Sequence, residues 1–220
     1  MPTPTQPPPS TRASHGRRAP KVSGDERERS ILATFEDLLE ERSFHAISID
    51  DIARGAGISR PTFYFYFASK EAVLLSLFER MIAEGMGAQG DALERLADDP
   101  AAAIRESLTA YFRAFGRHRA VTLAGADARV SSAEVRALWE RIMEVWVAQV
   151  ATAIEAERVR GNAPSGVPAR DLAIALVRMN ESSFYATFAG QAPAVGEEDV
   201  VDVLVAVWLN AIYGTAAPTA

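Results

Sequence analysis

The sequence contains no cysteine. This absence excludes disulfide bonds, thiolate zinc sites and cysteine nucleophiles, and nothing indicates an oxidising compartment. Long hydrophobic runs are also missing, because the longest uncharged apolar stretch, 203–209, is far shorter than the roughly 20 residues of a membrane-spanning helix. The N-terminus lacks the apolar core of a signal peptide. We therefore expect a cytoplasmic protein that does not associate with membranes.

Positive charge is scarce, since the chain has a formal net charge of -6. A DNA-binding protein usually carries a basic surface. The charge is unevenly distributed, however: the first 22 residues hold four basic side chains and no acidic one, whereas residues 71–220 hold 13 basic and 20 acidic side chains. This pattern is compatible with a DNA-binding element near the N-terminus and an acidic domain that faces away from phosphate.

The pattern of the chain predicts an all-α fold. Half of the 12 prolines lie in the first 20 residues, which predicts a flexible basic arm over residues 1–22. Beyond the arm, apolar residues recur with helical spacing and show no sustained alternation typical of strands. Capping-box patterns at Ser23–Glu26 and Ser131–Glu134 predict helix starts. The expected helices cover residues 23–42, 49–56, a short stretch after 59, and 70–96, 101–115, 131–161, 169–189 and 196–213, the last with three acidic residues in its first turn.

The segment Ile47–Lys70 contains two short helical patterns separated by a glycine. Ser48 is expected to cap the first helix, with two aspartates in its first turn beside the positive end of the helix dipole. Gly57 provides the left-handed conformation that a sharp turn requires, and Ser59 is expected to cap the second helix. Two helices of about two turns joined in this way are typical of a helix-turn-helix.

The second helix of this pair is predicted to have one buried and one exposed face. Phe63 and Phe67 are four residues apart and are expected to pack together in the core of a small domain. On the other face, tyrosine and lysine can reach phosphates, arginine can bind guanine, and a threonine methyl can contact thymine. The residues expected at the DNA are Ser48, Ser59, Arg60, Pro61, Thr62, Tyr64, Tyr66 and Lys70.

These residues resemble the signature of a known family. The run Thr62–Phe67 followed by Ser69–Glu71, and preceded by Ile52–Ala53 and Gly57–Ser59, is similar to the motif of TetR-type transcriptional repressors. The resemblance implies an all-helical fold of about nine helices. It divides the chain into a helix-turn-helix domain over 23–69, a ligand-binding and dimerisation domain over 70–215, and a tail over 216–220.

The same resemblance implies a mode of action. It implies a homodimer built on the last two helices, a palindromic DNA operator, release by a small apolar ligand, and control of a neighbouring monooxygenase-type gene. The last predicted helix supports the dimer, because it is apolar almost all round and one of its faces needs a partner. Neither enzymatic activity nor a cofactor is expected.

The C-terminal part carries aromatic residues at helical spacing, which form either an ordinary core or the wall of a ligand cavity. The resemblance favours a cavity, because one subgroup of the family has an aromatic-lined tunnel at these positions. The sequence departs from that subgroup at Val177 and Tyr185, where the subgroup has a polar amide and a phenylalanine. Asn180 is expected to orient the ligand. The expected pocket residues are Ile104, Tyr111, Phe115, Trp139, Met143, Trp146, Asn180, Phe184, Tyr185 and Trp208.

Other chemistries fit the sequence poorly. His15, His45 and His118 are too scattered to form a metal site. The stretch Gly55–Gly57 lacks the third glycine and the preceding strand of a dinucleotide fingerprint. Two alternatives stay open: an enzyme that converts an apolar substrate, although no nucleophile and base are paired, and a helical scaffold that does not bind DNA.

Overall fold

A computed structural model describes residues 24–214, apart from the side chains of residues 85–91 and 94. Within this range the chain forms nine α-helices and two short 3-10 helices, with no strand. The expected all-α fold is therefore confirmed. The predicted arm over residues 1–22, the predicted cap Ser23 and the tail over 216–220 lie outside the described residues.

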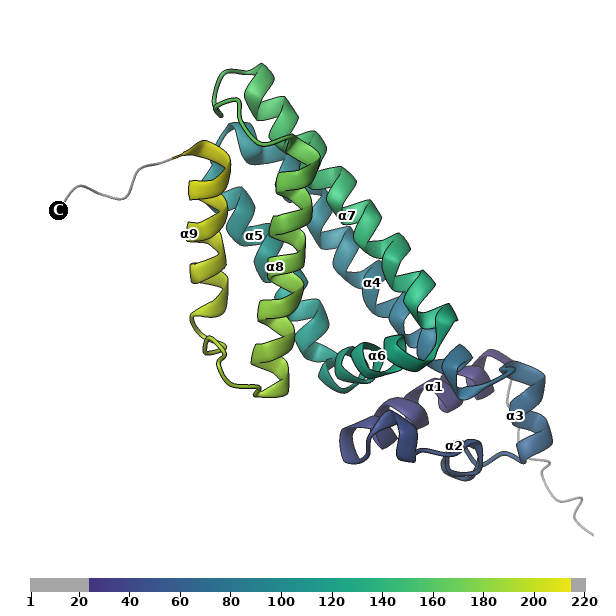
Figure 1. The fold of residues 1–220 in the computed structure, drawn as a ribbon. Coiled ribbons are helices and arrows are strands. Elements are labelled where there is room, and N and C mark those ends of the chain that lie inside the picture. Colours follow the sequence, from purple (N-terminus) through teal and green to yellow (C-terminus); the bar gives the residue numbers. More distant parts are fainter. Residues whose placement is uncertain (1–23, 215–220) are drawn as a thin grey trace, which may run out of the picture.

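The N-terminal helices form a small unit at one end of the molecule (Figure 1). Its elements are α1 (Gly24–Glu41), η1 (Phe44–Ala46), α2 (Ile49–Gly55) and α3 (Arg60–Tyr66). Ile31, Phe35 and Phe63 are fully buried in the core of this unit, in which α2 contacts both α1 and α3. This packing fixes the orientation of two short helices that would be unstable alone.

The remaining helices form a larger bundle that α4 joins to the N-terminal unit (Figure 1). These elements are α4 (Lys70–Glu94), η2 (Arg95–Ala97), α5 (Pro100–Arg117), α6 (Arg119–Ser131), α7 (Ala133–Val159), α8 (Ala169–Ala189) and α9 (Val200–Tyr213). The short α6 lies at the end of the bundle nearest α1, and α9 packs beside α5 and α8. None of the described helices is long and apolar enough to cross a membrane.

Two expected helix boundaries in the middle of the chain were wrong, and one helix was not expected. Ser131 belongs to α6, and Ser132 instead caps α7 by accepting a hydrogen bond from the Val135 N–H at 3.3 Å. The segment before Ser131 forms the helix α6, which was not expected. Gly116 does not end α5, because the ring of Phe188 packs beside it and compensates for the missing side chain.

The start of the last helix also differs from the expectation. Residues 197–199 form a turn, closed by a hydrogen bond of 3.0 Å from the Val200 N–H to the Gly196 carbonyl, and α9 starts only at Val200. The three acidic residues therefore precede the first turn of α9. Local charge favours a helix start near such residues but does not define where it occurs.

The end of the bundle remote from α1 is held by one buried carboxylate. Glu157 is fully buried and accepts hydrogen bonds from Arg160, from Asn162 at 3.2 Å, and from the Tyr213 hydroxyl at 3.0 Å. Burial acts to raise the pKa of Glu157, but these hydrogen bonds outweigh it and hold the pKa below its usual value. The carboxylate thus connects the end of α7, the following loop and the end of α9.

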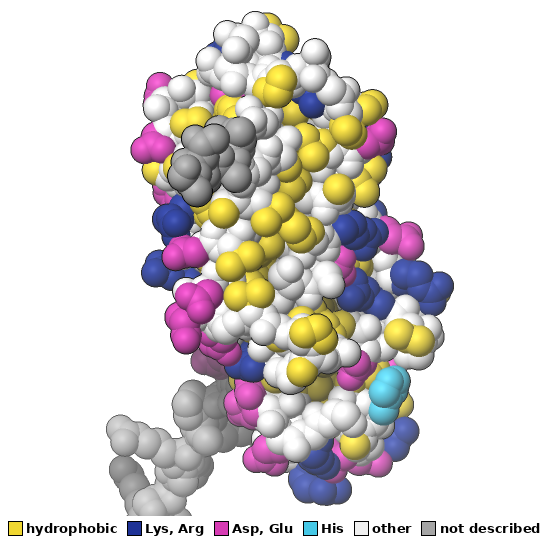
Figure 2. Space-filling model, turned by 60° about the vertical axis from the view of Figure 1, so that its left-hand side comes forward, with side chains coloured by type: hydrophobic (Ala, Val, Ile, Leu, Met, Phe, Trp, Pro, Cys, Tyr) yellow, Lys and Arg dark blue, Asp and Glu magenta, His cyan; other side chains and the backbone are white. Residues whose placement is uncertain are grey.

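A band of hydrophobic side chains lies across the outer surface of α8 and α9 (Figure 2). Ile174 on α8 and Val203 and Val207 on α9 are each about two-fifths exposed, at 39%, 44% and 39%. On the opposite side of α9, Leu204, Trp208 and Ile212 are buried. The last helix therefore buries one apolar face in the bundle and leaves a second apolar face uncovered.

Candidate DNA-binding and ligand-binding sites

The first helix of the helix-turn-helix begins at the predicted cap. The Ser48 hydroxyl accepts a hydrogen bond from the Asp51 N–H at 3.2 Å, and the Asp51 carboxylate accepts one from the Ser48 N–H at 3.0 Å. Hydrogen bonds from the Ser48 hydroxyl and backbone lower the pKa of Asp51. The stabilisation they provide is present above the pKa of the unfolded chain and is lost as the pH falls through the lower folded value. Ser48 therefore caps α2, as the sequence predicts.

The turn and the second cap also follow the sequence pattern. Gly57 has a φ of +66°, the left-handed conformation expected of it, and the Ile58 N–H donates to the Ala53 carbonyl at 2.9 Å. The Ser59 hydroxyl accepts from the Thr62 N–H at 3.3 Å and lies 2.8 Å from the Thr62 hydroxyl. Pro61 lies in the first turn of α3. These local contacts set the angle at which α3 leaves the turn.

The outward face of α3 is formed by Arg60, Tyr64 and Phe65. The Arg60 guanidinium lies 2.9 Å from Asp50 and 3.3 Å from the Tyr64 hydroxyl. Phe65 is 82% exposed, more than any other aromatic residue on this helix, and the sequence analysis did not assign it a role. Its position opposite Phe63 and Phe67 on the helix could have indicated this exposure. The result is a surface with a cation, a hydroxyl and an uncovered apolar ring.

Tyr66 and Lys70, both expected at the DNA, are only partly exposed in the structure. Tyr66 is half-buried and packs against the core rather than standing fully outward. The Lys70 ammonium donates to the carbonyl oxygens of Phe44 and Ile47, both at 2.9 Å, and lies 4.5 Å from the centre of the Phe44 ring. Lys70 therefore holds the chain between α1 and α2 against the start of α4. This structural role revises the expectation that Lys70 points outward to phosphate.

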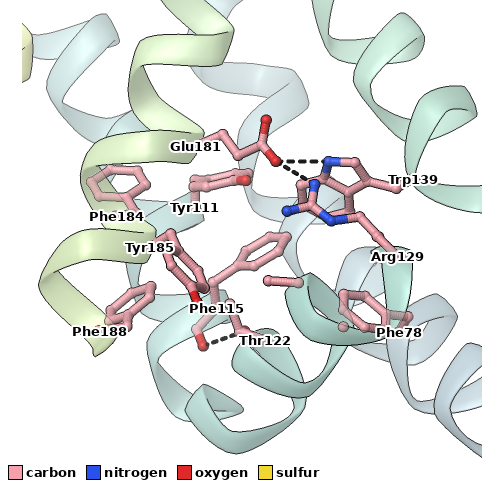
Figure 3. Close-up of a pocket in the computed structure, with 12 residues that line it drawn as sticks. Phe78, Tyr111, Phe115, Thr122, Arg129, Trp139, Glu181, Phe184, Tyr185 and Phe188 are labelled. Carbon is pink, nitrogen blue, oxygen red and sulfur yellow. Dashed lines mark hydrogen bonds and ion pairs between the residues drawn. The ribbon is translucent and has the colours of Figure 1, made fainter. Parts of the chain in front are cut away.

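The aromatic residues of the bundle surround a small cavity between α4, α5, α6, α7 and α8 (Figure 3). The cavity has a volume of about 30 Å³, enough for roughly one or two water molecules. The Tyr111 ring stacks with Phe115 at 4.3 Å and with Phe184 at 5.4 Å between ring centres. Burial raises the pKa of Tyr111, so its hydroxyl stays protonated. The protein's own rings thus fill most of the space that a ligand would occupy.

Half of the expected pocket residues line this cavity. Tyr111, Phe115, Trp139, Phe184 and Tyr185 line it, whereas Ile104, Met143, Trp146, Asn180 and Trp208 do not. The Asn180 side chain accepts a hydrogen bond from the Trp208 indole at 3.0 Å and is buried, so it joins α8 to α9. The Asn180 side-chain oxygen is therefore used within the protein, and Asn180 does not line the cavity in this conformation. Trp146 packs on Tyr111 with ring centres 4.8 Å apart, behind the cavity wall.

The polar part of the cavity wall is a cluster around Glu181. Its carboxylate pairs with Arg129 and accepts a hydrogen bond from the Trp139 indole at 2.9 Å. Arg178 binds the other carboxylate oxygen at 2.9 Å, and the Arg129 guanidinium lies 4.7 Å from the centre of a Trp139 ring. The sequence pattern does not indicate these polar residues, because their partners lie on three different helices. The other lining residues that it does not indicate are Phe78, Thr122, Gly125, Ala126 and Phe188.

Two of the helices that line the cavity, α4 and α6, also contact α1 of the N-terminal unit. Phe78 of α4 and Thr122 of α6 both line the cavity. At the start of α6, His118 Nδ1 lies 2.5 Å from a carboxylate oxygen of Glu36 on α1, and His118 Nε2 lies 3.5 Å from Glu84 on α4. A displacement of α6 would therefore change its contact with α1 directly. Among the described residues, no group of histidine and acidic side chains could hold a metal ion.

The fold and the geometry of the N-terminal unit define a class: a helix-turn-helix transcription regulator with a larger helical C-terminal domain. Residues 31–77 match the family model of bacterial regulatory proteins of the tetR family. Residues 104–214 match the C-terminal domain of the transcriptional regulator EthR. The chain therefore belongs to the TetR family and has an EthR-type C-terminal domain. Its relatives are transcriptional regulators, which are not enzymes.

Full-length relatives support this assignment. The chain is 52% identical over 205 residues to the HTH-type transcriptional regulator EthR of Mycobacterium tuberculosis strain ATCC 25618 / H37Rv, a match that covers 90% of this chain and 93% of the relative. It is 49% identical over 205 residues to EthR of Mycolicibacterium smegmatis, a match that covers 93% of this chain and 94% of the relative.

Solved structures show the same fold. A putative TetR-family regulator from Syntrophomonas wolfei aligns with a TM-score of 0.71 and 19% identity, over 90% of this chain and 100% of that chain. FadR from Thermus thermophilus, a TetR-family repressor in complex with lauroyl-CoA, aligns with a TM-score of 0.59 and 20% identity, over 88% and 98%.

Proposed function

We propose that the protein is a transcriptional repressor that binds a palindromic operator as a homodimer. The outward face of α3 carries this proposal, because Arg60, Tyr64 and Phe65 project from a helix whose other face is anchored in the core by Phe63. In the major groove, Arg60 would exchange its contact with Asp50 for guanine or phosphate. Tyr64 would bind phosphate, and the Phe65 ring would pack on thymine methyl groups.

The broader organisation is part of the same proposal. The DNA-binding domain would cover residues 23–69, and the ligand-binding and dimerisation domain would cover residues 70–215. The partner of this chain would be a second copy that packs on α8 and α9, and the protein would act in the cytoplasm on the promoter of a neighbouring monooxygenase-type gene. The apolar band on α8 and α9 supports the dimer.

We further propose that a small apolar ligand enters the aromatic cavity and releases the DNA. The ligand would separate the stacked rings of Tyr111, Phe115 and Phe184. The lauroyl-CoA complex of FadR supports an acyl chain as the kind of ligand that this fold accommodates.

Release would follow from a shift of α6 and α4. Expansion of the cavity would move Thr122 on α6 and Phe78 on α4, which line it. These shifts would act on α1 through the contact between His118 and Glu36 and on the helix-turn-helix through Lys70. Two recognition helices of a dimer must match grooves roughly 34 Å apart, so a displacement of a few ångströms prevents simultaneous docking.

The DNA part of the proposal is tested by fluorescence anisotropy with a labelled duplex from the region upstream of the protein's own gene. We expect specific binding to this duplex over a scrambled one. Phe65→Ala should weaken it by about tenfold, because an apolar base contact is lost. Val159→Ala is the matched control, since Val159 is 81% exposed at the far end of α7 and its loss should not change affinity. Equal affinities of the two variants would contradict the assigned face of α3.

The ligand part is tested with dodecan-1-ol in the same titration. We expect saturable quenching of tryptophan fluorescence and a parallel loss of DNA affinity. Linkage requires the DNA complex to bind the alcohol more weakly by the same factor. Quenching without loss of DNA affinity would contradict the proposed release of DNA by the ligand. The absence of any binding by apolar compounds would show that these aromatic residues form an ordinary hydrophobic core.

A further inference from the structure

A second hollow lies on the outside of the bundle, next to the aromatic cavity. It is an open groove of about 410 Å³ between the C-terminal half of α5, the end of α8 and the turn before α9. Phe112 and Phe188 form its aromatic surface, and Arg113, Arg117 and Arg119 line it together with Glu197. The groove therefore combines an apolar surface with an excess of positive charge.

One aromatic ring is shared between this groove and the aromatic cavity. Phe188 lines both of them. Its ring stacks on Phe112 with centres 4.9 Å apart, and it lies 3.3 Å from the position that a Cβ of Gly116 would occupy. Any side chain larger than hydrogen at position 116 would press on the ring. Rotation of Phe188 would therefore connect the outer groove with the interior.

The three arginines of the groove are not equally engaged. Arg119 donates to the Phe188 carbonyl at 2.6 Å and pairs with Glu197 at 2.8 Å. Arg117 is 3.7 Å from Glu84, which also faces His118. Arg113 is exposed and forms no ion pair with any described side chain. Arg113 and Arg117 lie one turn apart on α5, a spacing at which like charges repel. A bound monoanion would remove this repulsion.

We propose that the groove binds the carboxylate of a long-chain carboxylic acid, whose hydrocarbon tail passes Phe188 into the aromatic cavity. This inference rests on the proposed function, because the tail would occupy the cavity assigned there to an apolar ligand. Guanidinium groups bind a carboxylate through charge-assisted hydrogen bonds, and one negative charge matches the local excess. The head group would lie at the end of α5, one residue before His118 and its contact with Glu36. The groove would thus select an anionic amphiphile over a neutral one.

The test compares two probes of equal chain length, dodecanoate and dodecan-1-ol, on the full-length protein. Binding is followed by tryptophan fluorescence and calorimetry in the wild type and in Arg113→Gln. We expect dodecanoate to bind about tenfold more tightly than the alcohol in the wild type, and the variant to lose this preference. The affinity for dodecan-1-ol should be unchanged. Arg141→Gln is the matched control. Arg141 is an exposed arginine on α7 that does not line the groove, and its substitution removes the same charge.

Each outcome decides a different point. Equal affinity of the two probes in the wild type, or equal behaviour of Arg113→Gln and Arg141→Gln, would overturn the carboxylate site while leaving the proposed apolar ligand intact. Binding of acetate as tight as that of dodecanoate would show an anion site without entry of the tail, and would also overturn the inference. Failure of both long-chain probes to bind would overturn the ligand function itself.

Discussion

Individual side chains in this protein have functions that their sequence neighbours do not reveal. Lys70 is an instructive case, because it follows the recognition helix closely and its type suits a phosphate contact. In the structure its ammonium group binds two carbonyl oxygens of the segment that precedes α2. The Phe44 carbonyl also accepts a hydrogen bond of 3.4 Å from the Ile47 N–H, which closes the short 3-10 helix η1. Lys70 is therefore needed for the shape of the helix-turn-helix as well as for its charge.

This role predicts the effect of Lys70→Ala. Two charge-assisted hydrogen bonds are lost, and the Phe44 carbonyl keeps only the longer bond of 3.4 Å from the Ile47 N–H, so the free energy of unfolding should fall by about 2 kcal/mol. Arg54→Ala is the control. The Arg54 side chain is 78% exposed and its ion pair with Asp51 spans 3.6 Å at the surface. Its loss should change the free energy of unfolding by less than about 0.5 kcal/mol. Denaturant unfolding measures both. Equal stability of the two variants would show that the Lys70 contacts contribute nothing.

At the level of elements, α4 and α6 approach each other closely where both line the cavity. A Cβ placed on Gly125 of α6 would lie 1.9 Å from the ring of Phe78 on α4. This distance is far inside van der Waals contact, so the glycine is required by the packing of the two helices. The same two helices link the cavity to the N-terminal unit, through His118 at the start of α6 and through Lys70 at the start of α4.

The added methyl group of Gly125→Ala should therefore push α4 and α6 apart in the absence of any ligand. We expect a loss of about 1–3 kcal/mol in unfolding free energy and weaker operator binding at temperatures where the variant remains folded. Gly166→Ala is the control, because a Cβ at Gly166 meets nothing within 4 Å. Thermal melts and anisotropy titrations measure the two effects. If Gly125→Ala binds operator as the wild type does, movement of Phe78 is not coupled to DNA binding.

For the molecule as a whole, the uncovered apolar band on α8 and α9 would set the geometry of the proposed dimer. A two-fold interface uses the same surface on both subunits, and a pair of adjacent helices on each would meet as a four-helix seam. Such a dimer would hold the two recognition helices at a fixed separation, which is what a palindromic site requires. The proposed shift inside one subunit would then change the distance between the two DNA-binding surfaces of the dimer.

Val203→Arg and Val207→Arg should produce monomers in sedimentation velocity experiments. Each places a charge in the centre of the proposed interface, where it would be desolvated without a partner. Val159→Arg introduces the same charge at a residue that is 81% exposed and outside the band, and it should leave the dimer intact. Loss of the dimer should also abolish tight binding to a palindromic duplex. Dimers that persist in both α9 variants would place the interface on another surface.

The predictable features of this protein are those that depend on near neighbours in the chain. The caps at Ser48 and Ser59, the turn at Gly57 and the burial of Phe63 are all confirmed, because each involves groups within about one helical turn. The family signature lies in the same segment. The sequence by itself therefore determined the class of fold, the helix-turn-helix and most helix boundaries.

The remaining features depend on how distant helices pack, and only the tertiary structure decided them. Periodicity identified aromatic stripes, but it could not tell that Tyr111 faces the cavity while Trp208 binds Asn180. The contact between His118 and Glu36 joins residues 82 positions apart. Such contacts are set by the angle and rotation of each helix against its neighbours, which result from packing of the entire core and are not encoded in any short stretch of sequence.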